Sequence, residues 1–249
     1  MTIDQPAAIV AVFIALSLGG LLKGATGAGA PVVAVPVIAA FFDVRVAVAI
    51  MVVPNLITNL WQIRQFRSNR LSGNFAYWFA IAGAGGALAG TVLLAWLPVR
   101  MLTLLIVMVI FSYVALRLLR PEFTLAMKTA RTVVVPTGLI AGILQGATGI
   151  SAPVSVTFLN AMRLERPLFI YTISVFFAAM SFTQAPALYL YGLLTPVTVA
   201  VSVVSLVPLF TFMRVGERLA AKMSARTFDR IILILLVVLA FRLLYTAAG

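Results

Sequence analysis

The chain has 249 residues, of which 63% are hydrophobic and 10% are charged, and its mean hydropathy is +1.15. A water-soluble domain of this size needs more polar side chains to cover its surface, so the composition predicts a polytopic membrane protein. Cysteine and histidine are both absent, which excludes disulfides, thiol chemistry and imidazole proton relays, and the net charge of +12 lies in short loops rather than on one nucleic-acid-binding face.

Ten apolar runs follow one another along the chain, five in each half. They lie near residues 7–22, 30–41, 46–63, 74–96 and 101–119, and then near 132–144, 152–162, 167–190, 195–213 and 231–247. The first two runs of each half are shorter than the roughly 20 residues that a helix needs to cross the bilayer, and the other three are long enough. The predicted fold is all-α, with a re-entrant or broken-helix hairpin plus three spanning helices in each half.

A glycine-rich motif joins the two short runs of each half. Gly24-Ala-Thr-Gly-Ala-Gly-Ala-Pro-Val32 returns 122 residues later as Gly146-Ala-Thr-Gly-Ile-Ser-Ala-Pro-Val154, with seven of nine positions identical. Such a break at matching places in two hydrophobic halves is typical of a secondary transporter site. We interpret the pattern as a duplication, with a first membrane repeat at 1–120, a basic linker at 121–131 and a second repeat at 132–249.

Loop charge predicts how the two repeats are oriented. The segments Arg64–Arg70, 117–131 and 214–230 are rich in arginine and lysine and are predicted to be cytoplasmic. By repeat position, the first corresponds to the uncharged Tyr191–Pro196, and the basic segment 214–230 corresponds to the short turn Leu97–Arg100. Because the charge bias is reversed between equivalent loops, the sequence predicts inverted-topology repeats with both termini on the periplasmic side.

The second short helix of each half is expected to begin at a proline, Pro31 or Pro153, with Gly29 or Ser151 near its N-cap. Two helix N-termini that point at one place near mid-membrane would favour an anion there. Lys23 precedes the first motif, and no acidic residue lies within a predicted span to pair with it. A bound anion would be the missing partner of this buried ammonium.

Polar side chains also gather on the helix after each hairpin, where an oxyanion would find hydrogen-bond donors. They are Asn55, Thr58, Asn59 and Gln62 in the first half and Ser174, Ser181, Thr183 and Gln184 in the second. No catalytic residue, metal ligand or cofactor site is predicted. The predicted substrate-binding residues are Lys23, Gly24, Thr26, Gly27, Gly29, Asn55, Asn59, Gln62, Gln145, Gly146, Thr148, Gly149, Ser151 and Gln184.

Over nearly its whole length the chain resembles the TauE/SafE family of sulfite exporters. The resemblance rests on Gly19–Pro36, on Gly138–Pro153, and on the segment Gly216–Arg230 before the last apolar run. The family commonly has Gly-x-Gly-Gly at the hairpin, and the second copy here departs from it with Gly-Ile-Ser-Ala. The resemblance implies an exporter of a small sulfur-containing anion such as sulfite or an organosulfonate, in a bacterial inner membrane, with no nucleic-acid partner. It leaves the anion, the direction, the coupling ion and the oligomeric state open.

Several alternatives stay open at the level of sequence. The same features suit an anion channel or a permease for other small carboxylates or oxyanions, whereas an intramembrane enzyme has only Ser151 with Lys23 to draw on. Lys23 could instead reach the membrane interface, and Gln62 and Gln184 could serve only as interhelical hydrogen bonds. The cluster Gly83–Gly90 is expected to be helix packing, and Gly86→Ala is expected to be mild.

Overall fold

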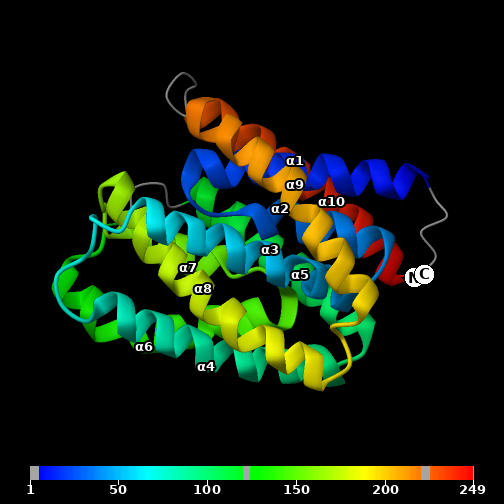
Figure 1. Cartoon of the computed structure of the whole chain (residues 1–249), viewed down its shortest axis with the longest axis horizontal. Helices are drawn as coiled ribbons and strands as arrows, with labels where there is room; N and C mark the ends of the chain where they lie inside the picture. Colours follow the sequence, from blue (N-terminus) through cyan, green and yellow to red (C-terminus); the bar gives the residue numbers. More distant parts are fainter. Residues whose placement is uncertain (1–5, 120–123, 220–224, 249) are drawn as a thin grey trace.

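The computed structural model describes residues 6–119, 124–219 and 225–248, and over these ranges it consists of ten α-helices joined by short loops (Figure 1). Arg120, Glu122 and Lys222, which belong to the predicted basic segments, lie outside the described residues. The helices are α1 Pro6–Thr26, α2 Ala30–Phe41, α3 Val44–Gln65, α4 Phe75–Trp96, α5 Val99–Leu119, α6 Met127–Thr148, α7 Ala152–Ala161, α8 Arg166–Leu190, α9 Pro196–Leu219 and α10 Ala225–Ala248.

The first helix of each half is longer than the sequence suggested. Helix α1 has 21 residues and α6 has 22, and both belong to the seven described helices that are long and apolar enough to cross a membrane, with α3, α4, α5, α8 and α9. The expectation of two short arms per hairpin is therefore wrong for the first arm. Helix α1 continues through Lys23 to Thr26, and α6 already begins at Met127, because these polar residues belong to helices that pack along α9 and α4. Of the described helices, α2 with 12 residues and α7 with 10 are the shortest.

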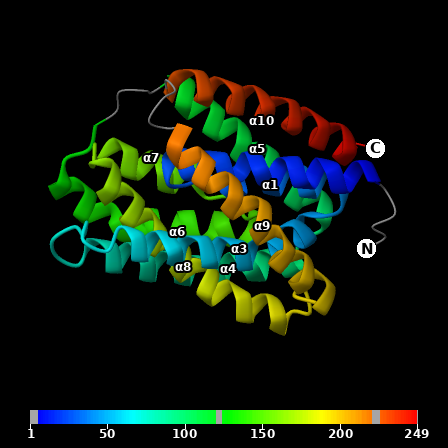
Figure 2. The same cartoon turned by 45° about the horizontal axis from the view of Figure 1, so that its top comes forward.

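The two halves are interleaved around a central pair of helices. Helices α3 and α8 pack against each other in the middle of the molecule (Figures 1 and 2). Helix α1 packs mainly on α9, and α6 packs mainly on α4, so the first helix of each half lies against a helix of the other half. Helices α5 and α10 form a further pair. The two halves therefore share one interior instead of forming separate bundles.

Glycines allow the backbones of α4 and α6 to touch. A Cβ atom on Gly86 would overlap the carbonyl oxygen of Leu139, and one on Gly142 would overlap the carbonyl oxygen of Gly83. The predicted packing role of the 83–90 cluster is confirmed, as expected for small residues at a helix interface in a membrane. The expectation that Gly86→Ala is mild is wrong, because the added methyl group meets backbone atoms that cannot move aside.

The contact between α1 and α9 is built in the same way. Cβ atoms on Gly20 and Gly24 would meet the carbonyl oxygens of Leu209 and Met213, and one on Gly216 would overlap that of Leu21. Gly20 and Gly24 are the counterparts of Gly142 and Gly146 in the repeated motif. Part of the duplicated glycine pattern is therefore explained by close helix packing.

The two ends of the molecule differ in their loops. The loop 66–74 lies at one end in both views, and the loop 191–195 lies at the opposite end together with the start of α1 and the end of α10 (Figures 1 and 2). The first end also carries the start of α6 and the end of α9, and we call it the basic end. Its exposed basic residues are Arg64, Arg67, Arg70, Lys128, Arg131, Arg163, Arg166, Arg214 and Arg218.

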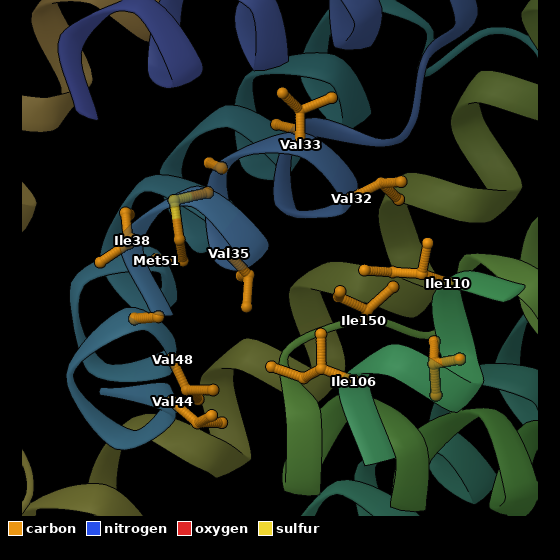
Figure 3. Close-up of a cluster of buried hydrophobic side chains, with 14 of the residues drawn as sticks. Val32, Val33, Val35, Ile38, Val44, Val48, Met51, Ile106, Ile110 and Ile150 are labelled. Atoms are coloured by element: carbon orange, nitrogen blue, oxygen red, sulfur yellow. The ribbon is translucent and has the colours of Figure 1, made fainter. Parts of the chain in front are cut away.

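Helix α3 changes character along its length. Its buried residues from Val44 to Val52 are all apolar, whereas those from Asn55 to Gln62 are all polar, being Asn55, Thr58, Asn59 and Gln62. The apolar half joins a cluster of side chains from α2, α5 and the α6–α7 connection, which includes Val35, Ile106 and Ile150 (Figure 3). The polar half is the one that leads toward loop 66–74 and the basic end.

Candidate anion-binding site

The two glycine motifs form matching breaks between helices. The first separates α1 from α2 at residues 27–29, and the second separates α6 from α7 at residues 149–151. Gly27 has φ 84° and Gly149 has φ 74°, in the left-handed region that favours glycine. The amide of each glycine donates to the carbonyl oxygen four residues earlier, on Lys23 or Gln145, at 2.7 Å. The repeated sequence therefore produces the same helix termination twice.

The threonines of the motif stabilise these breaks. Thr26 Oγ1 donates to the carbonyl oxygen of Leu22 at 2.8 Å and accepts a 3.3 Å hydrogen bond from the amide of Ala28. Thr148 repeats this arrangement, donating to the carbonyl oxygen four residues earlier at 2.7 Å and accepting from the amide of Ile150 at 3.2 Å. Both hydroxyl groups are thus engaged with local backbone, which gives them a structural role at the site.

The two breaks differ at their third residue. Gly29 is the N-cap of α2 with φ 100°, whereas Ser151 is the N-cap of α7 with φ −118°. A residue with negative φ does not need to be glycine, which explains how the second copy departs from the Gly-x-Gly-Gly pattern. Instead of capping α7, Ser151 Oγ donates to Gln145 Oε1 at 3.1 Å and lies 3.2 Å from Ser155 Oγ.

A small cavity lies between the two breaks and the central helices. Its free volume of about 10 Å³ is enough for about one water molecule, and its lining comes from both halves of the chain. The second residue of α2, the middle of α3, the end of α6, the second break and α8 all border it. The lining residues are Pro31, Val48, Met51, Val52, Asn55, Gln145, Gly149, Ser181 and Gln184.

Four of the predicted site residues meet at this cavity, namely Asn55, Gln145, Gly149 and Gln184. The remaining predicted residues lie around it without bordering it. They are the helix-contact residues Gly24 and Gly146, the break residues Thr26, Gly27, Gly29, Thr148 and Ser151, and the buried polar residues Lys23, Asn59 and Gln62.

Sequence reasoning left out the apolar wall of the cavity. Val48, Met51 and Val52 line it beside Asn55. The spacing of these four positions, i, i+3, i+4 and i+7, places them on one face of a helix, and this signal was present in the sequence. Ser181 was recognised as a polar residue of α8 but was not included among the binding residues, although it lines the cavity beside Gln184.

Lys23 is buried in the protein and does not extend to the membrane interface. Only 1% of its surface is exposed, and Nζ donates to Asn59 Oδ1 at 2.7 Å. Within the described residues, no carboxylate lies within ion-pair distance of Nζ. An ammonium in this environment is costly, by about 3 kcal/mol on insertion scales for a helix centre.

The two glutamines at equivalent positions both make interhelical hydrogen bonds. Gln62 Oε1 accepts from Ser174 Oγ at 3.1 Å, joining α3 to α8. Gln184 Nε2 donates to the carbonyl oxygen of Gly146 at 3.2 Å, joining α8 to α6 just before the second break. Both glutamines therefore join helices, and Gln184 also borders the cavity, so a binding role for this pair stays a prediction.

Comparison with known proteins agrees with this architecture. The model of the family described as "Sulfite exporter TauE/SafE" matches residues 12–243. No curated protein and no solved structure gives a significant match. The matched family consists of membrane transporters and not of enzymes, and the match covers almost every helix described above. The chain therefore belongs to the TauE/SafE sulfite exporter family and is a multi-pass membrane transport protein.

Proposed function

We propose that the protein exports a small sulfur-containing anion, such as sulfite or an organosulfonate, by alternating access around the cavity between the two breaks. The observation that carries this proposal is the lining of the cavity. It combines the amide groups of Asn55, Gln145 and Gln184 with the hydroxyl of Ser181, and none of its lining residues is acidic. Hydrogen-bond donors without a competing carboxylate suit an oxyanion.

The apolar wall supports the organosulfonate part of this proposal. Val48, Met51 and Val52 of α3 and Pro31 of α2 face the same small space as the polar groups. A sulfonate has a charged oxygen end and a carbon end, so it can contact both kinds of wall at once. Sites for small ligands commonly combine apolar walls with a few placed polar groups.

We further propose that the two halves, 1–120 and 132–249, are inverted repeats connected by the linker 121–131. The placement of loops 66–74 and 191–195 at opposite ends supports it, because these loops follow equivalent helices α3 and α8. The exposed arginines and lysines of the basic end favour the cytoplasm for that end. Both termini then face the periplasm of a bacterial inner membrane.

The character of α3 suggests how access alternates. Between the cavity and the end opposite the basic end, the apolar half of α3 packs with Val35, Ile106 and Ile150 (Figure 3). Toward the basic end, the polar residues Asn59 and Gln62 continue from the cavity. An anion therefore meets polar groups on the cytoplasmic route and a closed apolar layer on the other, as expected for an exporter that loads from the cytoplasm.

The proposal is tested first by binding. Purified protein is heated with sulfite, sulfate, thiosulfate, taurine, methanesulfonate or acetate, and the midpoint of thermal unfolding is measured at each anion concentration. A saturable upward shift with sulfite or methanesulfonate, reduced in Asn55→Leu, supports the proposal. A shift with acetate alone would replace it with a carboxylate permease, and no shift with any anion would overturn it.

Transport by the same protein is then measured in vesicles. Protein in vesicles loaded with unlabelled anion is expected to accelerate uptake of the labelled anion, because a carrier exchanges ligand across its cavity. Flux that rises linearly with anion concentration, without exchange, would instead indicate a channel.

A further inference from the structure

A line of buried hydrogen bonds connects Lys23 to the cavity. Lys23 Nζ donates to Asn59 Oδ1 at 2.7 Å, Asn59 Nδ2 donates to Asn55 Oδ1 at 2.9 Å, and Asn55 Nδ2 donates to Ser181 Oγ at 2.9 Å. None of these four side chains is more than 3% exposed. Asn55 and Ser181 border the cavity, whereas Lys23 and Asn59 do not.

The direction of this line is fixed by its first member. An ammonium group has three donors and no acceptor, so Asn59 must turn its amide oxygen toward Lys23. The NH₂ group of Asn59 then faces Asn55, where it donates to the main-chain carbonyl oxygen at 2.6 Å and to Oδ1 at 2.9 Å. The NH₂ group of Asn55 is left for Ser181. The orientation of the Asn59 amide therefore follows from the charge at the start, and the side-chain hydrogen bonds of the line are donated in the direction from Lys23 to the cavity.

The last member of the line is a hydroxyl group at the cavity wall. Ser181 Oγ accepts from Asn55, so its own proton remains to be donated, and Ser181 lines the space that a ligand would fill. Hydrogen bonds in such a chain polarise one another, and a charged donor at one end strengthens them. The positive charge of Lys23 therefore makes the hydroxyl group of Ser181 a stronger hydrogen-bond donor at the cavity.

We propose that Lys23 is a positioning residue that acts on the transported anion through Asn59, Asn55 and Ser181, without touching it. The inference rests on the proposed function and specifies its ligand: the group that meets Ser181 is a deprotonated, acceptor-only oxygen, as in sulfite or a sulfonate. A ligand that presents an N–H or O–H at this point would face another donor. We call the hydrogen-bonded line from Lys23 through Asn59 and Asn55 to Ser181 the relay. The relay selects against a ligand that presents a donor to Ser181.

The relay uses the two halves of the chain unequally. At the repeat offset of 122 residues, Lys23 corresponds to Gln145 and Asn59 corresponds to Ser181. The first half supplies the charge at a distance, and the second half supplies Gln145 and Ser181 directly at the cavity wall. The duplication therefore yields one asymmetric site rather than two equal ones.

The relay is tested by a double-mutant cycle on the purified full-length protein, with methanesulfonate as the ligand. Lys23→Met and Ser181→Ala should each weaken binding roughly tenfold, the size of one charge-assisted hydrogen bond. The double variant should be no weaker than the weaker single variant, within about twofold, because both changes break one line. Effects that multiply to about a hundredfold would overturn the relay.

Ser174 provides the matched control. It lies on α8 two turns before Ser181, it is fully buried, and it donates to Gln62 rather than to the relay. Ser174→Ala should leave methanesulfonate affinity within about twofold of the parent protein. A loss equal to that of Ser181→Ala would show that affinity follows any buried serine of α8, and the relay would be rejected.

A second arm needs no ligand. In Asn59→Asp, the new carboxylate can accept from Lys23 but cannot donate to Asn55. The midpoint of unfolding should stay the same or rise when Lys23 is present, and should fall by several degrees in the Lys23→Met background, where the carboxylate is buried without its partner. Equal shifts in both backgrounds would overturn the relay.

Failure of the parent protein to bind any tested anion would overturn the proposed function. The comparison of Asn59→Asp in the two backgrounds would still decide whether Lys23 and Asn59 are coupled.

Discussion

Gly27 and Gly149 adopt the same left-handed backbone conformation at the two breaks, with φ 84° and 74°, and each closes the helix before it through a 2.7 Å hydrogen bond. Their surroundings differ. A Cβ atom on Gly27 would overlap Cγ1 of Ile170, whereas one on Gly149 would lie 3.1 Å from Val35 Cγ2 and 3.2 Å from Val48 Cγ2. The two breaks are alike in backbone and unequal in free space.

The first prediction follows from this difference. Gly27→Ala should lower the midpoint of unfolding more than Gly149→Ala, because only Gly27 adds a severe overlap to the left-handed strain of about 1–2 kcal/mol. Gly149→Ala should also lose most transport, because Gly149 borders the cavity. Thermal unfolding and vesicle flux are measured for each variant.

Gly192 is the control for this comparison, because an alanine there has the backbone strain without the packing overlap. It has φ 71°, and a Cβ atom there would meet nothing within 4 Å. Gly192→Ala should therefore cost only the backbone strain and leave transport close to normal. If Gly149→Ala transported as well as Gly192→Ala, the second break would not be part of the transport site.

The second prediction concerns the contact between α4 and α6. Gly86→Ala should destabilise the protein strongly, because its methyl group would overlap the Leu139 carbonyl oxygen, which is backbone. Its neighbour Gly85 is the control, since a Cβ atom there would only approach Leu139 Cδ2 at 4.0 Å. Gly85→Ala should be neutral or slightly stabilising, given the higher helix propensity of alanine. Similar unfolding midpoints for the two variants would contradict the close packing.

The third prediction is the orientation in the membrane. A cysteine introduced at Arg67, in the loop 66–74, should be labelled only from the cytoplasmic side, and one at Gly192 only from the periplasmic side. The chain has no cysteine of its own, so each label reports one site. Labelling of both positions from the same side would exclude inverted repeats.

The fourth prediction tests the bond between α8 and the end of α1. Arg166 Nη2 donates to the carbonyl oxygens of Gly24 and Ala25, at 3.1 and 3.3 Å. These acceptors lie just before the first break, so Arg166→Ala should lower the midpoint of unfolding and Arg166→Lys should restore part of it, since an ammonium lacks the planar fork. The exposed Arg64 serves as the control, and a loss as large in Arg64→Ala would point to a general effect of surface charge.

The ten helices and the two breaks could be predicted because they depend on local signals: runs of apolar residues, and glycine and proline at fixed spacing. The lengths of α1 and α6 could not, because Lys23 and Gln145 are held in their helices by packing against other helices, which local pattern does not express. The hydrogen-bond partner of Lys23 could not be predicted from the sequence either. The burial of Lys23 was expected, but its acceptor is an asparagine 36 residues away, and α1 and α3 come together because both pack on α9.

The last prediction is that Lys23 is kept for function at the expense of stability. Lys23→Met removes a buried ammonium that costs about 3 kcal/mol and leaves Asn59 Oδ1 without its donor, which costs about 1–2 kcal/mol in return. The net gain of about 1–2 kcal/mol should raise the midpoint of unfolding of the empty protein by a few degrees. The same variant should lose most of the stabilisation that methanesulfonate gives to the parent protein.

Asn59→Leu is the matched control. It leaves the ammonium of Lys23 in place without an acceptor, so it should lower the midpoint of unfolding. If Lys23→Met unfolds at a lower temperature than the parent, the lysine stabilises the fold, and its burial is structural rather than functional.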